Sequence, residues 1–335
     1  MSSVVAPAWA VPRGTEGVRI MTQAVDGCMT EEECLAGTGL TPDDLADEDT
    51  EIWAHQEFTV VRNIIGKLGD QGVEVGGFST FGRAGILGFT FLASATVREG
   101  LERIVPYLAL SPSHVRLSVE TDDEHAYVVA DDADIPADVR GFIVERDLSG
   151  ISAVLQGAGA MPEVDRLETT LAADRAERLV KTWSITAEVW PNQPRNRIVG
   201  RPDMLDLPLP QADPNTARLF ERQCREVLER RLARVGVAGQ VRSRLYLDPS
   251  NLPSMQQVAD ELHLDPRTLR RKLTTEGTSF RALVDEVRRG LAERFLAAGE
   301  SIESIAQQLG YAETASFTHA YTRWTGVAPS RSRKR

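Results

Sequence analysis

Apolar residues recur with helical spacing over much of the N-terminal part of the chain. Residues 53–68 carry them at steps of three and four before Gly69, which predicts an amphipathic helix that ends at this glycine. Another helix is expected to start at Thr30, because three glutamates follow this capping residue. The apolar stretch 81–110 is interpreted as two helices, with Thr96 as the N-cap of the second.

The period changes to two after this helical part. Residues 114–120 and 126–132 alternate between apolar and polar side chains and are separated by a polar TDDEH segment, which predicts a pair of strands. A further helix is predicted over 139–157. Short strands are expected at 167–171, 186–190 and 197–199. The N-terminal part is therefore expected to fold as a mixed α+β domain.

A proline-rich connector follows this domain. Residues 205–216 read LDLPLPQADPNT, and three prolines in so short a segment do not sustain a helix. Helical spacing of apolar residues resumes at Asn215, and Gly236 and Gly239 are expected to end the helix. Two interpretations of its apolar stripe stay open: the helix packs on its own domain, or it forms a dimer contact.

One helical motif occurs twice near the C-terminus. The copies start at Ser254 and Ser301, and both serines are expected to cap a helix. At a constant offset of 47, Met255, Val258, Ala259 and Leu262 correspond to Ile302, Ile305, Ala306 and Leu309. At an offset of 48, Leu269 and Leu273 correspond to Phe317 and Tyr321. Two aligned copies predict helix-turn-helix units over 254–275 and 301–324.

The second helix of each unit presents a polar face. With Leu269 and Leu273 turned inward, three arginines and Thr274 share the opposite face of the first unit. Arginines placed in this way suit bidentate hydrogen bonds to guanine and contacts with phosphate; the alternative is a solvated surface. The residues expected to contact DNA are Arg267, Thr268, Arg270, Arg271, Thr274, Thr314, Ala315, Ser316, Thr318, His319 and Arg323.

A helix over 279–297 is expected to join the two units. At 1.5 Å per residue, roughly 19 residues make a rod of about 28 Å. This length is close to the ~34 Å between successive major grooves on one side of DNA, so one monomer can enter two grooves. The basic end of the chain, 331–335, is expected to add phosphate contacts.

Charge is distributed unevenly between the two halves. The whole chain has a net charge of −11, but residues 241–335 carry 15 basic and 11 acidic side chains. Residues 1–240 hold 23 basic and 38 acidic side chains. A basic module carried by an acidic one is typical of a nucleic-acid-binding part attached to a regulatory part.

The sequence carries no recognisable catalytic or cofactor motif. It has no G-x-S-x-G, phosphate loop or dinucleotide fingerprint. Its three cysteines and five scattered histidines form no metal-ligand pattern. We therefore expect no enzyme, no cofactor and no metal. Unpaired cysteines, a polar N-terminus and the lack of a ~20-residue apolar run predict a cytoplasmic protein without membrane contact.

The C-terminal part resembles the AraC/XylS family of bacterial regulators. SIESIAQQLGY followed by SFTHAYTRWTGVAPSRSR fits the signature of that family, including Gly310, Trp324, Gly326 and Pro329. The first unit departs from the second in having His263 where the second has Gly310. The resemblance implies a DNA-binding regulator rather than an enzyme tethered to DNA.

The N-terminal half resembles the arabinose-binding-like effector domain of ornithine-utilisation and VirS-type regulators. The resemblance is carried by FGRAGILGFTFLASATVREGLERIVPYL and by LDLPLPQADP. It implies an effector-responsive regulator, usually an activator and often a homodimer, that works on double-stranded DNA with RNA polymerase and a small-molecule effector of unknown identity. The alternative is a ligand-independent DNA-binding regulator controlled by a protein partner.

These observations divide the chain into four parts. We expect a disordered tail over 1–16, an α+β effector domain over 17–206, a linker and candidate dimerisation helix over 207–236, and an all-α DNA-binding domain over 237–335.

The sequence leaves the effector-binding residues unknown. Aromatic residues that are candidates for an apolar pocket, or alternatively for ordinary core, are Trp53, Phe58, Phe78, Phe81, Phe89, Phe91 and Trp183. Arg62 or Arg83 is a candidate partner for a carboxylate ligand, with a surface position as the alternative.

Overall fold

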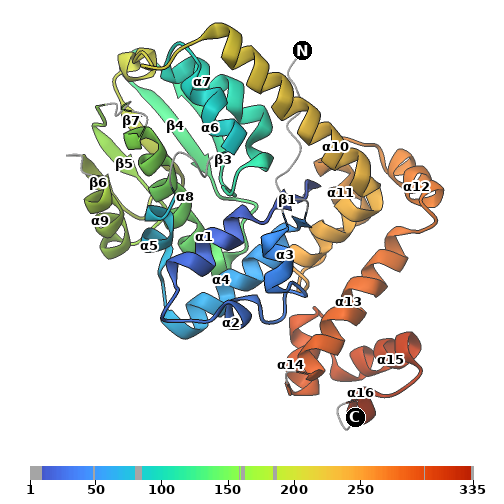
Figure 1. The fold of residues 1–335 in the computed structure, drawn as a ribbon. Helices are drawn as coiled ribbons and strands as arrows, with labels where there is room; N and C mark the ends of the chain where they lie inside the picture. The colour runs from blue at the N-terminus through green and yellow to red at the C-terminus, as the bar shows by residue number, and fades with distance from the viewer. Residues whose placement is uncertain are drawn as a thin grey trace. The chain divides into compact units, whose positions relative to one another are not determined.

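The chain folds into two compact units (Figure 1), one built mainly from residues 12–232 and the other mainly from residues 233–335. The computed structural model describes residues 10–47, 50–79, 85–157, 159, 163–183, 187–297 and 299–332. Each unit has its own core, so each is considered by itself.

A five-stranded sheet lies at the centre of the first unit (Figure 1). Its strands, in spatial order, are β3 (Arg116–Thr121), β4 (Ala126–Asp131), β7 (Asn196–Gly200), β5 (Arg166–Glu168) and β6 (Glu188–Trp190). All neighbours are antiparallel except β5 and β6. In this register Leu117, Val128 and Ile198 share one face, because paired residues of neighbouring strands point to the same side. The expected α+β fold is confirmed.

Helices accompany this sheet, and those within residues 31–68, 85–104 and 137–157 lie where the sequence predicted them, whereas those at 16–24, 72–77 and 173–182 were not predicted. The helices are α1 (Glu16–Ala24), α2 (Glu31–Leu35), α3 (Pro42–Ala46), α4 (Ala54–Leu68), α5 (Gly72–Gly77), α6 (Gly85–Leu92), α7 (Val97–Ile104), α8 (Ala137–Gly157) and α9 (Ala173–Thr182). The described part of this unit also contains the 3₁₀ segments η3 (Val105–Leu110) and η4 (Pro202–Asp206). The caps at Thr30 and Thr96 are confirmed, since each hydroxyl accepts a hydrogen bond from a backbone N–H three residues on.

The expected disordered tail over 1–16 is wrong from residue 10 onward. A short strand, β1 (Arg13–Gly14), pairs with β2 (Glu51–Ile52). The Arg13 side chain donates to the carbonyls of Ser111 and Ser113, at 2.7 Å each. These bonds join positions about a hundred residues apart, so no local pattern in the sequence reports them. Residues 1–9 lie outside the described part of the chain.

The helix predicted from Asn215 ends at Gly236, as expected, and a second helix follows it directly. The label α10 covers both helices, Pro214–Leu247, and Gly236, at φ 64° and ψ 179°, is the non-helical residue between them. Beyond Gly236, the Glu276 carboxylate accepts hydrogen bonds from the backbone N–H groups of Val237 and Ala238, at 2.8 and 2.7 Å. A partner distant in sequence therefore caps a new helical segment at the place where the glycines predicted a stop.

The first part of α10 packs on its own unit. Cys224 is fully buried with Leu87 of α6 and Tyr107 of η3, and Leu228 lies against the same cluster. Of the two interpretations of this helix, packing on its own domain is therefore present, and most of the expected linker over 207–236 belongs to the first unit. A different side of the helix stays open, because Leu219 is 43% exposed.

The second unit is all-helical in its described residues, as expected. Beyond α10 it contains α11 (Met255–Glu261), α12 (Pro266–Thr275), α13 (Phe280–Ala297), α14 (Ile302–Gln308), α15 (Thr314–Thr325) and α16 (Pro329–Ser332). Figure 1 shows α13 as the rod between the α11–α12 pair and the α14–α15 pair. The buried stripe of α13 includes Leu283, Val287 and Leu291.

Candidate functional site

Local capping sets the start of each helix in the two helix-turn-helix units. Ser254 and Gln257 form a reciprocal capping box at α11, and the Ser301 hydroxyl accepts from the backbone N–H of Ser304 at α14. Asp265 caps α12 by accepting from the backbone N–H of Thr268 at 2.9 Å. The capping serines predicted from the repeat are thereby confirmed.

The repeat also marks the buried positions of both units. Residues that are fully or almost fully buried are Val258, Ala259, Leu269 and Leu273 in the first unit, and Ile305, Ala306, Leu309, Phe317 and Tyr321 in the second. Leu262, expected at an equivalent position, is only partly buried.

The turns of the two units share one backbone geometry. His263 and Gly310 occupy equivalent positions and both have positive φ, 54° and 72°. In each turn the next backbone N–H bonds back to the buried alanine, Leu264 to Ala259 at 2.8 Å and Tyr311 to Ala306 at 2.9 Å, which is the pattern that closes a helix on a left-handed residue. A histidine here carries strain that glycine does not.

Helix α12 presents the arginine face that the sequence predicted. Arg267, Arg270 and Arg271 are exposed, and within the described residues none of their guanidinium groups forms an ion pair. Other arginines of this unit are paired, for example Arg242 with Glu286 and Arg244 with Glu261, each at 2.7 Å. The face therefore carries positive charge that is available to an outside partner.

The two threonines of α12 differ in availability. The Thr268 hydroxyl donates to the Asp265 carboxylate and is partly buried. These hydrogen bonds hold the pKa of Asp265 below its ordinary value. Thr274 is exposed, and its hydroxyl donates to the carbonyl of Arg270 at 2.9 Å. Thr274 can exchange that bond for an external one, whereas Thr268 holds the helix cap.

Helix α15 presents a smaller, mostly uncharged face. Ala315, Ser316 and His319 are exposed, while Thr314 and Thr318 are half-buried. The Thr318 hydroxyl donates to the carbonyl of Thr314 at 2.9 Å.

The one arginine predicted on α15 already has partners. The guanidinium of Arg323 lies 3.3 Å from Asp285 of α13 and 5.9 Å from the centre of the Trp324 ring. Its side chain is nevertheless largely exposed. The structure thus brings the predicted residues onto two helix faces of unequal charge, one rich in free guanidinium groups and one small and polar.

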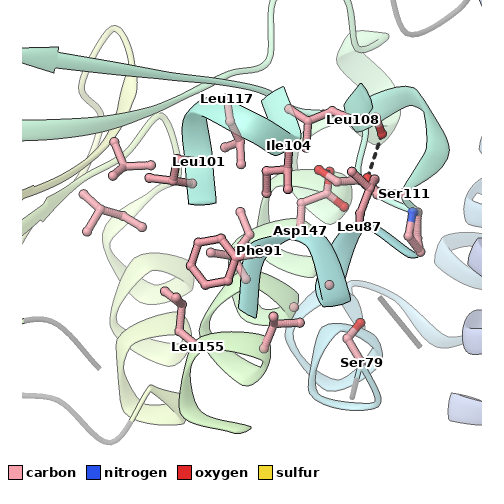
Figure 2. Close-up of a pocket in the computed structure, with 18 of the residues that line it drawn as sticks. Ser79, Leu87, Phe91, Leu101, Ile104, Leu108, Ser111, Leu117, Asp147 and Leu155 are labelled. Atoms are coloured by element: carbon pink, nitrogen blue, oxygen red, sulfur yellow. Dashed lines mark hydrogen bonds between the residues drawn. The ribbon is translucent and has the colours of Figure 1, made fainter. Parts of the chain in front are cut away.

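The sequence did not locate a cavity that the first unit contains. Its volume is about 170 Å³, and it lies between the sheet face of Leu117, α7 with Leu101, and α8 with Leu155. Figure 2 shows Ser111 and Asp147 on the same side of this cavity, away from Leu155. The wall residues come from elements spread over the whole first unit, so no single periodic pattern shows them together.

Among the aromatic candidates that the structure describes, Phe91 alone lines this cavity. Phe58 and Trp183 are core residues, whereas Phe78 and Phe89 are exposed. Trp53 is partly buried and does not line the cavity.

Of the two candidate carboxylate partners, Arg62 does not line the cavity. Arg62 pairs with Asp138 at 2.6 Å on the surface. Phe81 and Arg83 lie outside the described residues.

A buried charge cluster adjoins the cavity. Arg146 donates to Glu57 at 2.6 Å and lies 2.8 Å from Asp147, and His114 Nε2 lies 3.0 Å from Glu57. Burial and the neighbouring Arg13 lower the pKa of His114, against the opposing effect of Glu57. The imidazole is therefore neutral at pH 7, and the carboxylates are balanced by arginine.

Within the described residues no cluster of histidine, cysteine and acidic side chains is arranged to hold a metal ion. Cys34 and Cys224 are buried and Cys28 is exposed, all as free thiols. Burial raises the pKa of the Cys34 thiol to about 11. In the same part of the chain, no helix is long and apolar enough to cross a bilayer.

Two family profiles match the two parts of this chain. The N-terminal arabinose-binding domain of AraC transcription regulators matches residues 29–209, and a helix-turn-helix domain matches residues 258–335. An uncharacterized HTH-type transcriptional regulator of Mycobacterium tuberculosis is 37% identical over 312 residues, 90% of each chain. The ornithine utilization regulator of Pseudomonas aeruginosa is 27% identical over 262 residues, 73% of each chain.

A solved structure spans both units. The transcriptional regulator CdpR of Pseudomonas aeruginosa aligns with 96% of this chain and 98% of its own, at 22% identity and a TM-score of 0.47.

Proposed function

Because this chain belongs to the AraC family of DNA-binding transcription regulators, a non-enzymatic class, we propose that it is an effector-responsive activator that inserts α12 and α15 into successive major grooves of double-stranded DNA. The observation that carries this proposal is the face of α12, where Arg267, Arg270 and Arg271 are exposed and, in the described structure, unpaired. The proposal places the protein in the cytoplasm, together with the chromosome and RNA polymerase.

Helix α12 is suited to read base pairs. A guanidinium group offers two parallel N–H donors to O6 and N7 of guanine, and neighbouring guanidinium groups on the same face reach phosphates. Arg271 lies at the centre of the face, so we assign it to a contact with a base. Arg267 lies near the start of the helix, and we assign it to a contact with the phosphate backbone of the DNA. Thr274 extends the face by one turn.

Helix α15 is suited to a different kind of contact. Its methyl group at Ala315 and its hydroxyl at Ser316 favour apolar and single hydrogen-bond contacts with base edges. His319 is exposed on the same helix. Arg323 is held beside Asp285, and in this position we expect it to contact the phosphate backbone of the DNA. We therefore expect most of the charge-dependent affinity to come from α12.

The spacing of the two pairs supports a two-groove arrangement. Helix α13 has 18 residues between them, which corresponds to about 27 Å at 1.5 Å per residue. Successive major grooves on one face of DNA are ~34 Å apart. The side chains and turns at both ends of the rod make up the remaining distance.

A homodimer is part of the proposal. Phe220 of α10 stacks on Phe89 of α6 with ring centres 5.6 Å apart. Phe89 is 44% exposed, and Leu219, which precedes Phe220 on α10, is 43% exposed. Large apolar side chains gathered on a surface are typical of an interaction site, and a dimer would bring two copies of each recognition helix to one operator.

The cavity of the first unit favours an effector-responsive regulator over a ligand-independent one. A ligand activates only if it binds one arrangement of the protein better than another, and a tenfold preference corresponds to about 1.4 kcal/mol.

The test begins with selection of operator sequences from random duplex DNA by the purified full-length protein. Transcription from a selected site with RNA polymerase is then measured with and without cellular small-molecule extract. Activation that requires the extract supports the proposal. Sequence-independent binding, or transcription unchanged by the protein under both conditions, would overturn it.

A further inference from the structure

The wall of the cavity in the first unit is unsuited to a strongly polar ligand. It is formed by the sheet face of Leu117, Val128 and Ile198 and by apolar side chains of α6, α7 and α8. Its volume of about 170 Å³ exceeds the ~150 Å³ of an apolar cavity that holds one benzene ring. A sugar or an amino acid would bury several polar groups against this wall without partners, which is unfavourable.

The charged side chains at the polar end of this cavity are already satisfied by the protein. Asp147 accepts from the backbone N–H groups of His114 and Val115, at 2.6 and 3.0 Å, and from the hydroxyl of Ser113 at 3.0 Å. Arg146 donates to Glu57, to Asp147 and to the carbonyl of Pro112. Neither group is available to bind a ligand ion.

A second cavity adjoins the first and contains a different kind of group. The two share Gly17, Ser111 and Pro112 in their walls, and Arg13 is among the residues that line the second. Arg13 is only 2% exposed. One of its terminal nitrogens donates to the carbonyls of Ser111 and Ser113, but its Nε and its other terminal nitrogen have no hydrogen-bond partner in the described structure. Buried donors are almost always paired in folded proteins, so this guanidinium is prepared for an outside acceptor.

The charge balance around Arg13 selects the kind of acceptor. Arg13 and Arg146 are matched by Glu57 and Asp147, so the buried cluster is neutral with His114 uncharged. The other charges that line the second cavity are also compensated: Arg19 lies 3.7 Å from Glu16, and Arg231 lies 3.6 Å from Glu51. A carboxylate ligand would add an unmatched negative charge close to two buried carboxylates, which is costly in a low-dielectric interior. A neutral carbonyl oxygen adds none.

We infer that the first unit binds a neutral, mainly apolar molecule with a carbonyl-type acceptor at one end, whose apolar part occupies the cavity between the sheet and α6, α7 and α8 and whose oxygen accepts hydrogen bonds from Arg13. This inference rests on the proposed role of the first unit as effector domain and names the chemical class of its effector. It excludes the sugar that the matching family profile is named for, and the amino acid in the printed name of one relative.

The experiment compares ten-carbon probes that differ only at the head, using the full-length protein. The probes are N-methyldecanamide, decanoate and decylamine, with D-arabinose and L-ornithine as polar probes, and the readouts are calorimetric titration and thermal shift. We expect the amide to bind at least tenfold more tightly than decanoate or decylamine and to raise the melting temperature. We expect no effect of arabinose or ornithine.

Three variants test the assigned contacts. Arg13→Met keeps the length of the side chain but removes its donors, and it should weaken amide binding about tenfold while leaving the weak affinity for n-decane, which has no acceptor, unchanged. Ile151→Trp fills the cavity and should abolish binding of all the alkyl probes. Arg195→Met removes an exposed arginine that pairs with Glu120, and it should bind the amide like the wild type.

Several results would overturn the inference. They are tighter binding of decanoate than of the amide, stabilisation by arabinose or ornithine, no binding of any alkyl probe to the wild type, or amide binding unaffected by Arg13→Met. If that variant fails to fold, the comparison of the amide with n-decane on the wild type decides the role of the acceptor. Operator binding is measured on the same samples. If no probe binds but the protein still binds its operator, the inference is rejected, and the DNA-binding part of the proposed function stands.

Discussion

Replacement of Arg271 by alanine tests whether α12 reads bases. In the described structure the Arg271 guanidinium is exposed and forms no ion pair. Its removal therefore breaks no interaction that stabilises the free protein. The whole effect should appear in the complex with DNA, and the melting temperature should stay close to that of the wild type.

The expected magnitude follows from the contact assigned to this arginine. A bidentate pair with guanine contributes about 1–3 kcal/mol of discrimination, which corresponds to roughly 5- to 150-fold in Kd. An arginine that contacts only phosphate would instead weaken binding to all sequences equally and lower the salt slope by about 1. The Arg271→Ala variant should therefore lose affinity for the selected operator and much less for random DNA.

The assay is fluorescence anisotropy with operator and scrambled duplexes at several fixed salt concentrations. Arg242→Ala is the matched control, because it removes the same charge from the same unit but from a side chain that pairs with Glu286 at 2.7 Å. Its effect on operator binding should stay within about 0.5 kcal/mol. Equal losses of Arg271→Ala on both duplexes would refute base reading, and no loss on either would show that the face is only solvated.

Further predictions concern the autonomy, assembly and stability of the two units. A fragment of residues 233–335 should fold alone, as measured by circular dichroism, and bind DNA with an affinity that falls steeply with salt, because phosphate neutralisation releases counterions. The double variant Leu219→Glu and Phe220→Glu should stay folded but sediment as a monomer, because it places charge on the exposed side of α10. Glu57→Gln should destabilise the protein by about 3–5 kcal/mol at pH 7 in thermal or urea unfolding, because it leaves buried positive charge uncompensated. His263→Gly should stabilise the second unit by about 1 kcal/mol, because it relieves a positive φ of 54°.

The predictions for the fragment, the dimer and Glu57 each have a contrary outcome. An unfolded fragment would show that the second unit needs the first. A wild type that is monomeric at micromolar concentration, with and without DNA, would reject the dimer. Burial alone would raise the pKa of Glu57, but His114 and Arg146 outweigh it and bring the pKa below its ordinary value of 4.5. The contribution of this carboxylate is thus present above pH 4.5 and lost as the pH falls, so a variant with the acid sensitivity of the wild type would contradict it.

Much of the fold was predictable from short-range signals. Thr30, Thr96 and Ser254 cap helices through groups three residues away, so sequence spacing alone identifies them. The duplicated motif marked the cores of both helix-turn-helix units for the same reason, because helical contacts join residues three and four apart. The arginines of α12 were likewise placed on an exposed face by their distance from Leu269 and Leu273.

Only the tertiary structure decided the features that depend on distant partners. A second helix follows directly after Gly236 because the distant Glu276 caps its first turn. Arg13 belongs to a folded unit because its acceptors lie at Ser111 and Ser113. The cavity is likewise assembled from elements spread over the whole first unit. A local hydrophobic period records which side of a helix or strand is buried, but it carries no information about which distant groups meet there. The helix-turn-helix units were therefore predictable, and the cavity of the first unit was not.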